Sequence, residues 1–382
     1  MQCRAMGKSG FKVSILGFGC MRLPTLGAHD KIDEEKAIPM VRSAIDRGVN
    51  YLDTAYPYHG GNSERVVGKI VKDGYRARVA VATKMPCWKI AAHEDFDRIF
   101  EEQRERLGIE AIDFYLLHGL SAEGWKNMKA HGAIRWLERR AAAGHIRHFG
   151  FSFHDRLPAL KQIIDDYGGW TFCQLQYNYL NEHVQAGREG VEYAAAKGLA
   201  VIVMEPLLGG LLGSPPEPVK AIFDAAPGRP SPASVALRWL WDQPAVTTVL
   251  SGMGAMAQVD ENIAAADTAT AGCLTDAERD LVGRVLAWYK ARNPVPCTTC
   301  GYCRPCPQGV AIPENFMLYN DMNSIQRQEN MFRSLYAALP LEERAESCTA
   351  CRECEERCPQ EIKISEWMPR VHEALRRQPA KT

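Results

Sequence analysis

The first 290 residues alternate between short apolar runs and longer amphipathic stretches. Apolar runs of this length are typical of buried strands. The stretches between them repeat apolar residues at helical spacing, and several end in glycine, a common helix terminator. We predict strands at 13–19, 49–55, 78–84, 111–118, 148–152, 172–178, 199–205 and 246–252, with helices between them, for example at 34–48, 93–108, 135–144 and 189–198.

Eight strands that each precede a helix, over about 250 residues, are the pattern of a (β/α)8 TIM barrel. The same alternation suits a doubly wound sheet, which carries a Gly-x-Gly-x-x-Gly fingerprint after its first strand. That fingerprint is missing here, because LGFGCM contains only Gly17 and Gly19. We therefore predict an α/β fold with a TIM barrel over residues 1–292.

Two similar cysteine runs lie near the end of the chain, and each closes on Cys-Pro-Gln. Two-residue gaps allow consecutive thiolates to curl around one [4Fe–4S] cubane, and the closing proline breaks any helix there. In two-cluster ferredoxins the fourth cysteine of each run binds the other cluster. By that precedent one cluster would take Cys297, Cys300, Cys303 and Cys358, and the second Cys348, Cys351, Cys354 and Cys306.

Other chemistries for these cysteines suit the spacing less well. Structural zinc also uses Cys-x-x-Cys pairs, but it favours two well-separated pairs over four cysteines strung together. Disulfides are poor candidates in a chain of this size that starts without a secretory signal. The final gap is one residue shorter in the first run than in the second, which leaves the pairing between the runs open. The remaining five cysteines are scattered and are expected to pack as small hydrophobic residues.

The cysteine runs belong to a predicted second domain over residues 293–382, a small α-helical ferredoxin-like domain with two [4Fe–4S] clusters. Residues 313–339, between the runs, have a helical pattern. A last helix is predicted at 364–378, with Ser365 as its N-cap.

Charge and hydropathy exclude several classes of partner. The chain has 46 basic and 46 acidic residues, evenly mixed, so nothing predicts binding to nucleic acid or to an anionic membrane surface. No segment approaches the ~18 apolar residues that span a bilayer, and the amino terminus has no apolar signal segment. We expect a cytoplasmic protein, in a reducing compartment that suits iron–sulfur ligation.

Polar side chains follow successive predicted strands at their carboxyl ends, where TIM barrels carry their chemistry. Asp53 and Tyr58 follow the second strand, Lys84 the third and His118 the fourth. In the segments LDTAYPYHGGNSE, VATKMP and DFYLLHGL the chain resembles the aldo/keto reductase superfamily. GHIRHFGFSFH, CQLQYNYL and VIVMEPLLGG extend the resemblance over about residues 9–290. With its cysteine runs, the chain resembles the branch fused to a ferredoxin-like domain.

The resemblance implies an oxidoreductase acting on a small carbonyl or alcohol substrate. Tyr58 would be the acid and base, and the Lys84 ammonium would lower its pKa from an ordinary value near ~10. Asp53 would anchor Lys84, and His118 would hydrogen-bond the carbonyl oxygen. Alone, each residue also suits an ordinary structural role, so the prediction depends on the four together.

The resemblance also implies a nicotinamide nucleotide at the barrel mouth. Met204 stands where an aromatic residue usually stacks on the nicotinamide, and Phe153 replaces a frequent asparagine. Gly252 and Gln258 stand where Lys and Arg would clamp the 2′-phosphate of NADP, so we predict that NADH is favoured over NADPH. The expected cofactor-binding residues are Gly19, Cys20, Met21, Ser152, Gln174, Met204, Pro206, Leu207, Glu261 and Asn262.

The two kinds of cofactor differ in how they carry electrons. Hydride transfer moves two electrons together, whereas a cluster passes one. A flavin is the usual device for splitting the pair, and the barrel mouth could hold one, although the sequence has no flavin motif. The clusters could instead be structural, or could exchange electrons with an external carrier such as ferredoxin. The alternative function is an electron-transfer protein whose barrel is a docking scaffold without catalysis.

Overall fold

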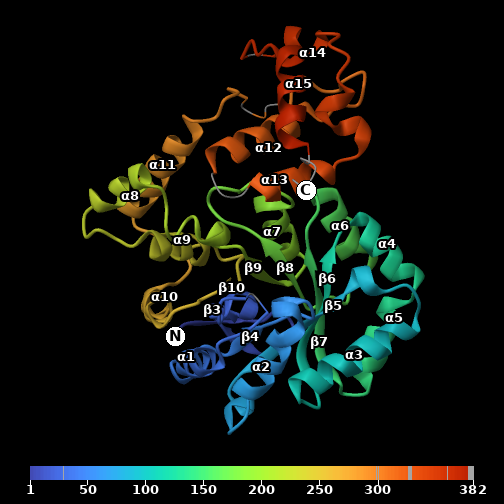
Figure 1. Ribbon diagram of the computed structural model, residues 1–382, viewed down its shortest axis with the longest axis vertical. Helices are drawn as coiled ribbons and strands as arrows, with labels where there is room; N and C mark the ends of the chain where they lie inside the picture. Colours follow the sequence, from blue (N-terminus) through green and yellow to red (C-terminus); the bar gives the residue numbers. More distant parts are fainter. Residues whose placement is uncertain (29, 298, 300, 326–328, 359, 377–382) are drawn as a thin grey trace. The chain divides into compact units, whose positions relative to one another are not determined.

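The chain forms two compact units in a computed structural model (Figure 1). The structure describes residues 1–28, 30–297, 299, 301–325, 329–358 and 360–376. The units are Met1–Arg279 and Asp280–Thr382, so the division falls inside helix α11 (Asp276–Lys290). The domain boundary expected from the sequence, between 292 and 293, lies beyond this helix and stays a prediction.

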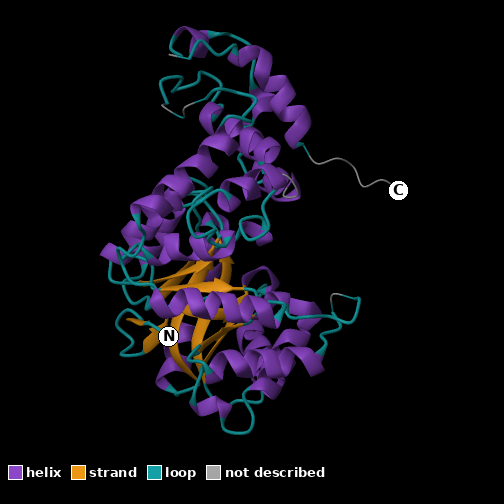
Figure 2. Cartoon of the chain, turned by 90° about the vertical axis from the view of Figure 1, so that its left-hand side faces the viewer, coloured by secondary structure: helices purple, strands orange, loops and turns teal. Residues whose placement is uncertain are grey.

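Eight parallel strands close into a barrel in the first unit, which confirms the predicted fold. Around the barrel the order is β10-β3-β4-β5-β6-β7-β8-β9, and Figure 2 shows the strands at the centre of the unit with helices around them. The strands are β3 (Leu16–Gly19), β4 (Tyr51–Asp53), β5 (Ala80–Pro86), β6 (Ile112–Leu120), β7 (Ile146–Phe153), β8 (Phe172–Gln176), β9 (Ala200–Met204) and β10 (Thr248–Ser251).

A short antiparallel hairpin precedes the barrel, and the sequence did not predict it. Its strands, β1 (Cys3–Ala5) and β2 (Lys12–Ser14), have three residues each, too few for a periodic pattern to show. Apolar side chains of this segment pack with residues from the early parts of the barrel strands, in a cluster that includes Met6, Val13, Tyr51, Phe114 and Phe172. The hairpin therefore closes the amino-terminal end of the barrel.

Helices cover the outside of the barrel. They are α1 (Glu34–Asp46), α2 (Asn62–Ile70), α3 (Glu94–Leu107), α4 (Ala122–Ala130), α5 (Ala133–Ala142), α6 (Leu157–Asp166), α7 (Gly187–Ala196), α8 (Glu217–Asp224), α9 (Pro232–Trp241) and α10 (Met256–Thr268). In α3 the buried residues recur at helical spacing, and the helix ends at Gly108 with φ of 63°, a conformation that favours glycine.

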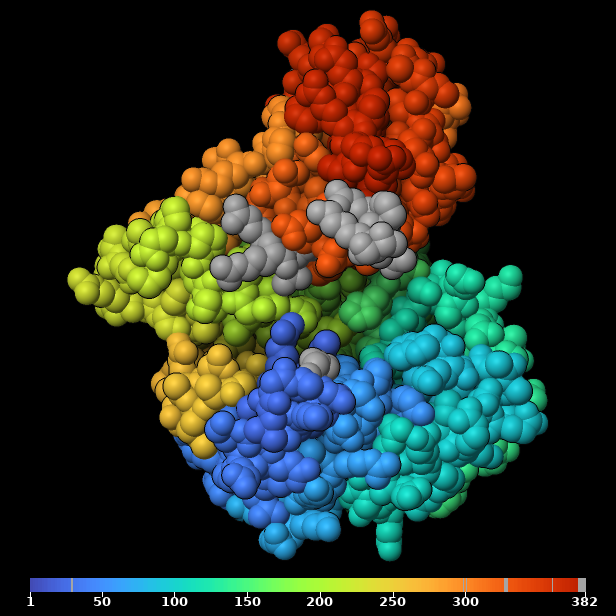
Figure 3. Space-filling view, in the orientation of Figure 1, coloured from blue at the N-terminus to red at the C-terminus, as the bar shows by residue number. Residues whose placement is uncertain are grey.

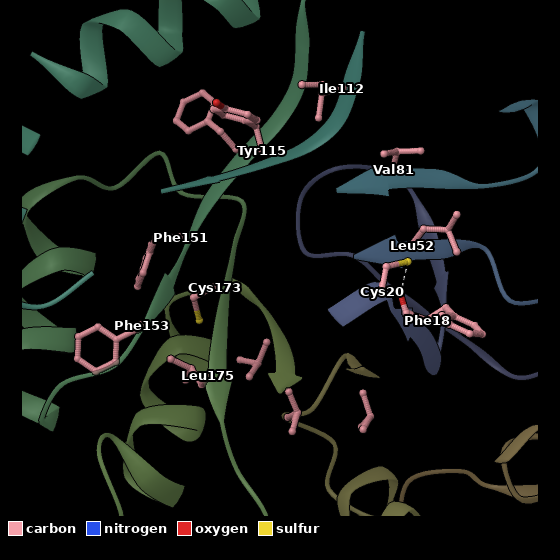
Figure 4. Packing of buried hydrophobic residues seen from close by; sticks show 14 of the residues in the cluster. Phe18, Cys20, Leu52, Val81, Ile112, Tyr115, Phe151, Phe153, Cys173 and Leu175 are labelled. Carbon is pink, nitrogen blue, oxygen red and sulfur yellow. Dashed lines mark hydrogen bonds between the residues drawn. The ribbon is translucent and has the colours of Figure 1, made fainter. Parts of the chain in front are cut away.

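Outward-facing strand residues and the helices form the main hydrophobic core, part of which is drawn in Figure 4. Phe18, Leu52, Val81 and Phe151 lie in this layer. On the face shown in Figure 3, the side chains of helices and loops cover the barrel strands. Since alternate strand residues point to opposite sides, the same strands direct their other side chains into the barrel.

The second unit consists of helices and loops in its described residues (Figure 2). Its helices are α12 (Ile312–Ser324), α13 (Glu329–Ala337), α14 (Glu353–Glu356) and α15 (Ile364–Leu375). The helical pattern predicted α12, α13 and α15, but not the short α14, which lies within the second cysteine run. The predicted N-cap at Ser365 is wrong, because α15 begins at Ile364 and the Ser365 backbone N–H and hydroxyl donate to Glu355 Oε1 at 2.7 and 2.6 Å. Across the described residues of both units, every helix is too short or too polar to cross a membrane.

Candidate active site

The parallel orientation of the barrel strands brings the four predicted catalytic residues to one end of the barrel. Asp53 is the last residue of β4, Lys84 lies near the end of β5, and His118 near the end of β6. Tyr58 begins a 3-10 turn (Tyr58–Gly61) after β4. All four line one cavity, as expected from the sequence.

Lys84 is the centre of this group and is completely buried. Its Nζ donates to Asp53 Oδ1 at 2.6 Å, to the Thr54 carbonyl at 2.9 Å and to the Tyr58 hydroxyl at 3.4 Å. A buried ammonium requires this set of partners, because desolvation alone would favour its neutral form. The coulombic attraction of Asp53 opposes that desolvation, and the pKa of Lys84 is raised overall. Lys84 is therefore charged next to Tyr58.

The expected pKa of Tyr58 needs a correction. Burial raises the pKa of Tyr58, Lys84 opposes the rise, and the Asp53 charge adds to it, so the net direction is upward. The sequence argument considered the lysine but not the loss of water around the phenol. Tyr58 is consequently protonated near neutral pH, with Lys84 placed to stabilise its phenolate.

His118 lies against two aromatic rings. Its centroid is 6.1 Å from that of Tyr58, edge to face, and 5.0 Å from that of Trp88. Burial first, and then the charge of Lys84, hold the pKa of His118 well below its ordinary value. His118 is therefore neutral at pH 7 and is available as a hydrogen-bond donor.

The cavity has a volume of about 630 Å³, which is in the range of small-molecule and cofactor sites. The expected cofactor-binding residues that line it are Gly19, Met21, Ser152, Gln174, Met204, Pro206, Leu207, Glu261 and Asn262. Cys20 is the exception, since its side chain is fully buried in the core, where its thiol donates to the Phe18 carbonyl at 3.9 Å (Figure 4).

The inner part of the cavity has polar groups that fit a nicotinamide carboxamide. Gln174 Nε2 donates to the Met204 sulfur at 3.7 Å, while the buried Gln174 Oε1 has no partner among the residues that the structure describes. Ser152 accepts a hydrogen bond from the Gly119 N–H at 2.8 Å and keeps its own hydroxyl proton to donate. An amide that both donates and accepts would satisfy these groups. Phe153 is buried in the hydrophobic core, away from these polar groups.

The outer part of the cavity holds a cation that the sequence analysis missed. Arg22 lines the cavity, and a Cβ built on Gly252 would lie 3.3 Å from the Arg22 stem. This contact depends on β3 and β10 being neighbours at the barrel closure, which no local pattern reveals. Three glycine residues of the loop after β9 line the same cavity, and their backbone N–H groups already donate within that loop to Glu205 Oε2, the Leu207 carbonyl and the Gly210 carbonyl: Gly209, Gly210 and Gly213.

The second unit groups its cysteines across the two runs. Cys297, Cys303 and Cys358 line one small cavity together with the apolar residues Ile312, Pro313, Phe316, Ile362 and Ile364. The fourth member of that predicted set, Cys300, lies outside the described residues. Thiolates in an apolar pocket are what a cubane requires, so the residues fit the group.

The other four cysteines also lie near one another. Burial raises the pKa of the Cys354 thiol to about 12, and the electrostatic influence of Cys348, Cys306 and Cys351 adds to the rise. Within the described part of the chain, no three His, Cys, Asp or Glu residues are grouped tightly enough for a single metal ion.

The fold and the cavity define a barrel oxidoreductase with an appended iron–sulfur domain. A family model described as the aldo/keto reductase family matches residues 15–271, and a 4Fe-4S dicluster domain model matches residues 296–362. The chain belongs to the aldo/keto reductase family.

Similar proteins are known from several organisms. L-galactose dehydrogenase of Arabidopsis thaliana is 28% identical over 285 residues, which cover 69% of this chain and 88% of that protein. The uncharacterized oxidoreductase YqkF of Bacillus subtilis is 26% identical, covering 70% and 92%. Among solved structures, the holo form of aldo-keto reductase AKR11C1 from Bacillus halodurans superimposes with a TM-score of 0.63 at 26% identity, covering 75% of this chain and 96% of that chain.

Proposed function

We propose that the barrel cavity reduces a small carbonyl compound, or oxidises the corresponding alcohol, with Tyr58 as the acid and base. The observation that carries this proposal is the convergence of Asp53, Tyr58, Lys84 and His118 on one cavity. A bound nicotinamide nucleotide would supply or accept the hydride.

Each residue then has a separate task. In the reducing direction the substrate carbon takes the hydride, and the substrate oxygen takes the proton of the Tyr58 hydroxyl. The raised pKa of Tyr58 keeps it protonated, which is the form that this direction needs. Lys84 stabilises the phenolate left by proton transfer, and neutral His118 donates a hydrogen bond that orients the carbonyl oxygen.

The nucleotide would lie between the Gln174 end and the Arg22 end of the cavity. We propose NADH as the preferred form, since Gly252 and Gln258 are uncharged, the carboxylate of Glu261 would repel a 2′-phosphate, and Arg22, the cation beside Gly252, would be engaged by another part of the nucleotide. Arg22 would contact the pyrophosphate, which both nucleotides share. Arg22→Ala should then weaken the binding of NADH and of NADPH by similar factors, as measured in fluorescence titrations. A selective loss of NADPH binding would contradict this assignment of Arg22. A flavin bound in place of the nucleotide would be detected by its visible absorption spectrum.

The second unit would hold two [4Fe–4S] clusters on the two sets of cysteines. When bound, they would supply or accept single electrons for the barrel cavity or for an external carrier such as ferredoxin, in a cytoplasmic setting. An anaerobic preparation should contain about eight irons per chain, as two cubanes require. Stoichiometric zinc in place of iron would refute the cluster assignment.

Substitution of the acid tests the enzymatic proposal directly. Tyr58→Phe removes the hydroxyl and keeps the ring against His118. We expect reduction of every carbonyl substrate to fall by about 10²- to 10⁴-fold, with nucleotide binding unchanged. Unchanged turnover would leave the docking-scaffold function as the better account of the barrel.

A further inference from the structure

A second imidazole lies beside the catalytic residues and has no part in the proposed reaction. His154 follows β7, two residues after Ser152, and both line the cavity with His118. A Cβ built on Gly119 would lie 4.0 Å from ring atoms of both His154 and Trp88. Two imidazoles therefore line the cavity side by side with the catalytic residues, and the Trp88 indole packs against His118.

Two glutamines determine where His154 carries its proton. Gln185 Nε2 lies 3.4 Å from His154 Nδ1 and 3.2 Å from Gln176 Oε1, so its two protons are directed at these two acceptors. Because an amide nitrogen only donates, His154 Nδ1 accepts, and the ring proton is on Nε2. Gln176 ends β8 and is 5% exposed, which anchors the chain of hydrogen bonds in the barrel wall.

The hydrogen-bond network around His154 includes locally unfavourable features. Gln185 has φ of 59°, a conformation that is uncommon for a residue with a side chain. In the described part of the chain, the Oε1 of Gln185 and the Nε2 of Gln176 are buried without partners. Unfavourable local features that persist next to an active site are typical of positions selected for function.

The surroundings of His154 also determine its charge state. Burial lowers the pKa of His154, the hydrogen bond from Gln185 opposes this, and the charge of Lys84 lowers it further, with the net direction downward. The ring therefore presents a neutral Nε2–H donor near the position of the substrate.

We propose that His154 recognises a hydroxyl group next to the substrate carbonyl, so that the substrates are hydroxy-aldehydes or hydroxy-ketones. The inference rests on the proposed function, which puts the carbonyl against Tyr58 and His118. An apolar substituent would leave the Nε2–H desolvated and unpaired. A carboxylate would require a cation, and Lys84, whose charge acts on His154, is already paired with Asp53 at 2.6 Å. A hydroxyl group needs only the neutral donor.

Hydroxyacetone and butanone provide a matched test, since they differ by a hydroxyl in place of a methyl group. The wild type should reduce hydroxyacetone with a kcat/KM about 10- to 100-fold higher than that for butanone. His154→Phe keeps an aromatic ring and should remove this preference by lowering only the hydroxyacetone value. Gln185→Leu should reduce the preference as well, and 15N NMR of labelled histidine should then show His154 no longer fixed as the Nε2–H form.

The outcomes separate the two proposals. Equal kcat/KM for both ketones in the wild type, or an equal loss of both in a folded His154→Phe variant, would overturn the hydroxyl-recognition site while leaving carbonyl reduction intact. A His154 that is protonated on Nδ1 in the wild type would also overturn it. If the wild type reduces neither ketone nor any aldehyde, the proposed function fails, and this inference with it.

Discussion

The buried ammonium of Lys84 allows catalysis and folding to be tested separately. Its Nζ lies 3.4 Å from the Tyr58 hydroxyl oxygen. At an effective dielectric constant of about 20, a unit positive charge at that distance stabilises a phenolate by about 5 kcal/mol. Lys84→Met removes the charge and keeps an unbranched side chain. The pKa of Tyr58, already raised by burial, should rise further, and a weaker acid transfers its proton less readily.

We therefore expect Lys84→Met to slow carbonyl reduction by about 10²- to 10⁴-fold, the range associated with loss of general acid catalysis. The assay is a single-turnover measurement of NADH consumption with saturating substrate, because steady-state rates could report product release. Nucleotide affinity should change little, since Lys84 contacts Asp53, Thr54 and Tyr58.

A double variant provides the control for folding. Lys84→Met alone leaves the buried Asp53 carboxylate without its cation, which should cost about 3–5 kcal/mol of unfolding free energy. Adding Asp53→Asn removes the second charge and should recover most of that loss in a thermal or urea unfolding measurement. The reduction rate should stay low in the double variant. A double variant that recovers both stability and rate would refute the role of Lys84 in stabilising the Tyr58 phenolate.

Two further predictions concern protonation and packing. Because the pKa of Tyr58 is raised, the rate of carbonyl reduction should be nearly independent of pH between about 6 and 9. Alcohol oxidation needs the phenolate, so its rate should rise about tenfold per pH unit over the same range. An oxidation rate that levels off within this range would contradict the raised pKa of Tyr58. Gly150→Ala should lower the unfolding free energy of the barrel by about 1–3 kcal/mol or more, because the new Cβ would lie 2.2 Å from the Phe172 carbonyl on the paired strand. Gly168→Ala is the control: a Cβ there meets open space, so the same unfolding assay should show almost no change.

The barrel and the convergence of the four candidate catalytic residues were predictable because their signals are local. Each strand is an apolar run, and Asp53, Lys84 and His118 each stand at the carboxyl end of one, where barrel topology alone brings them together. The hairpin at the amino terminus escaped prediction because its two strands are too short to show a period.

Features that depend on distant parts of the chain were not predictable in the same way. Arg22 approaches Gly252 only because the first and last barrel strands pair. The direction of the Tyr58 pKa depends on how much protein surrounds the hydroxyl, which spacing along the chain does not give. The Cys20 side chain points into the core, although its neighbours Gly19 and Met21 line the cavity.

The grouping of the cysteines bears on a question that the unequal gaps left open. Each set takes members from both runs, since Cys358 lies with Cys297 and Cys303, and Cys306 lies near Cys354. The roughly forty residues between the runs, including α12 and α13, therefore form a loop that ligand bonds would close at both sites. Loop closure costs conformational entropy, and ligation offsets that cost. Two independent zinc sites, each built from the four cysteines of one run, would leave this loop open. The interleaved grouping therefore favours the two-cluster arrangement that we propose.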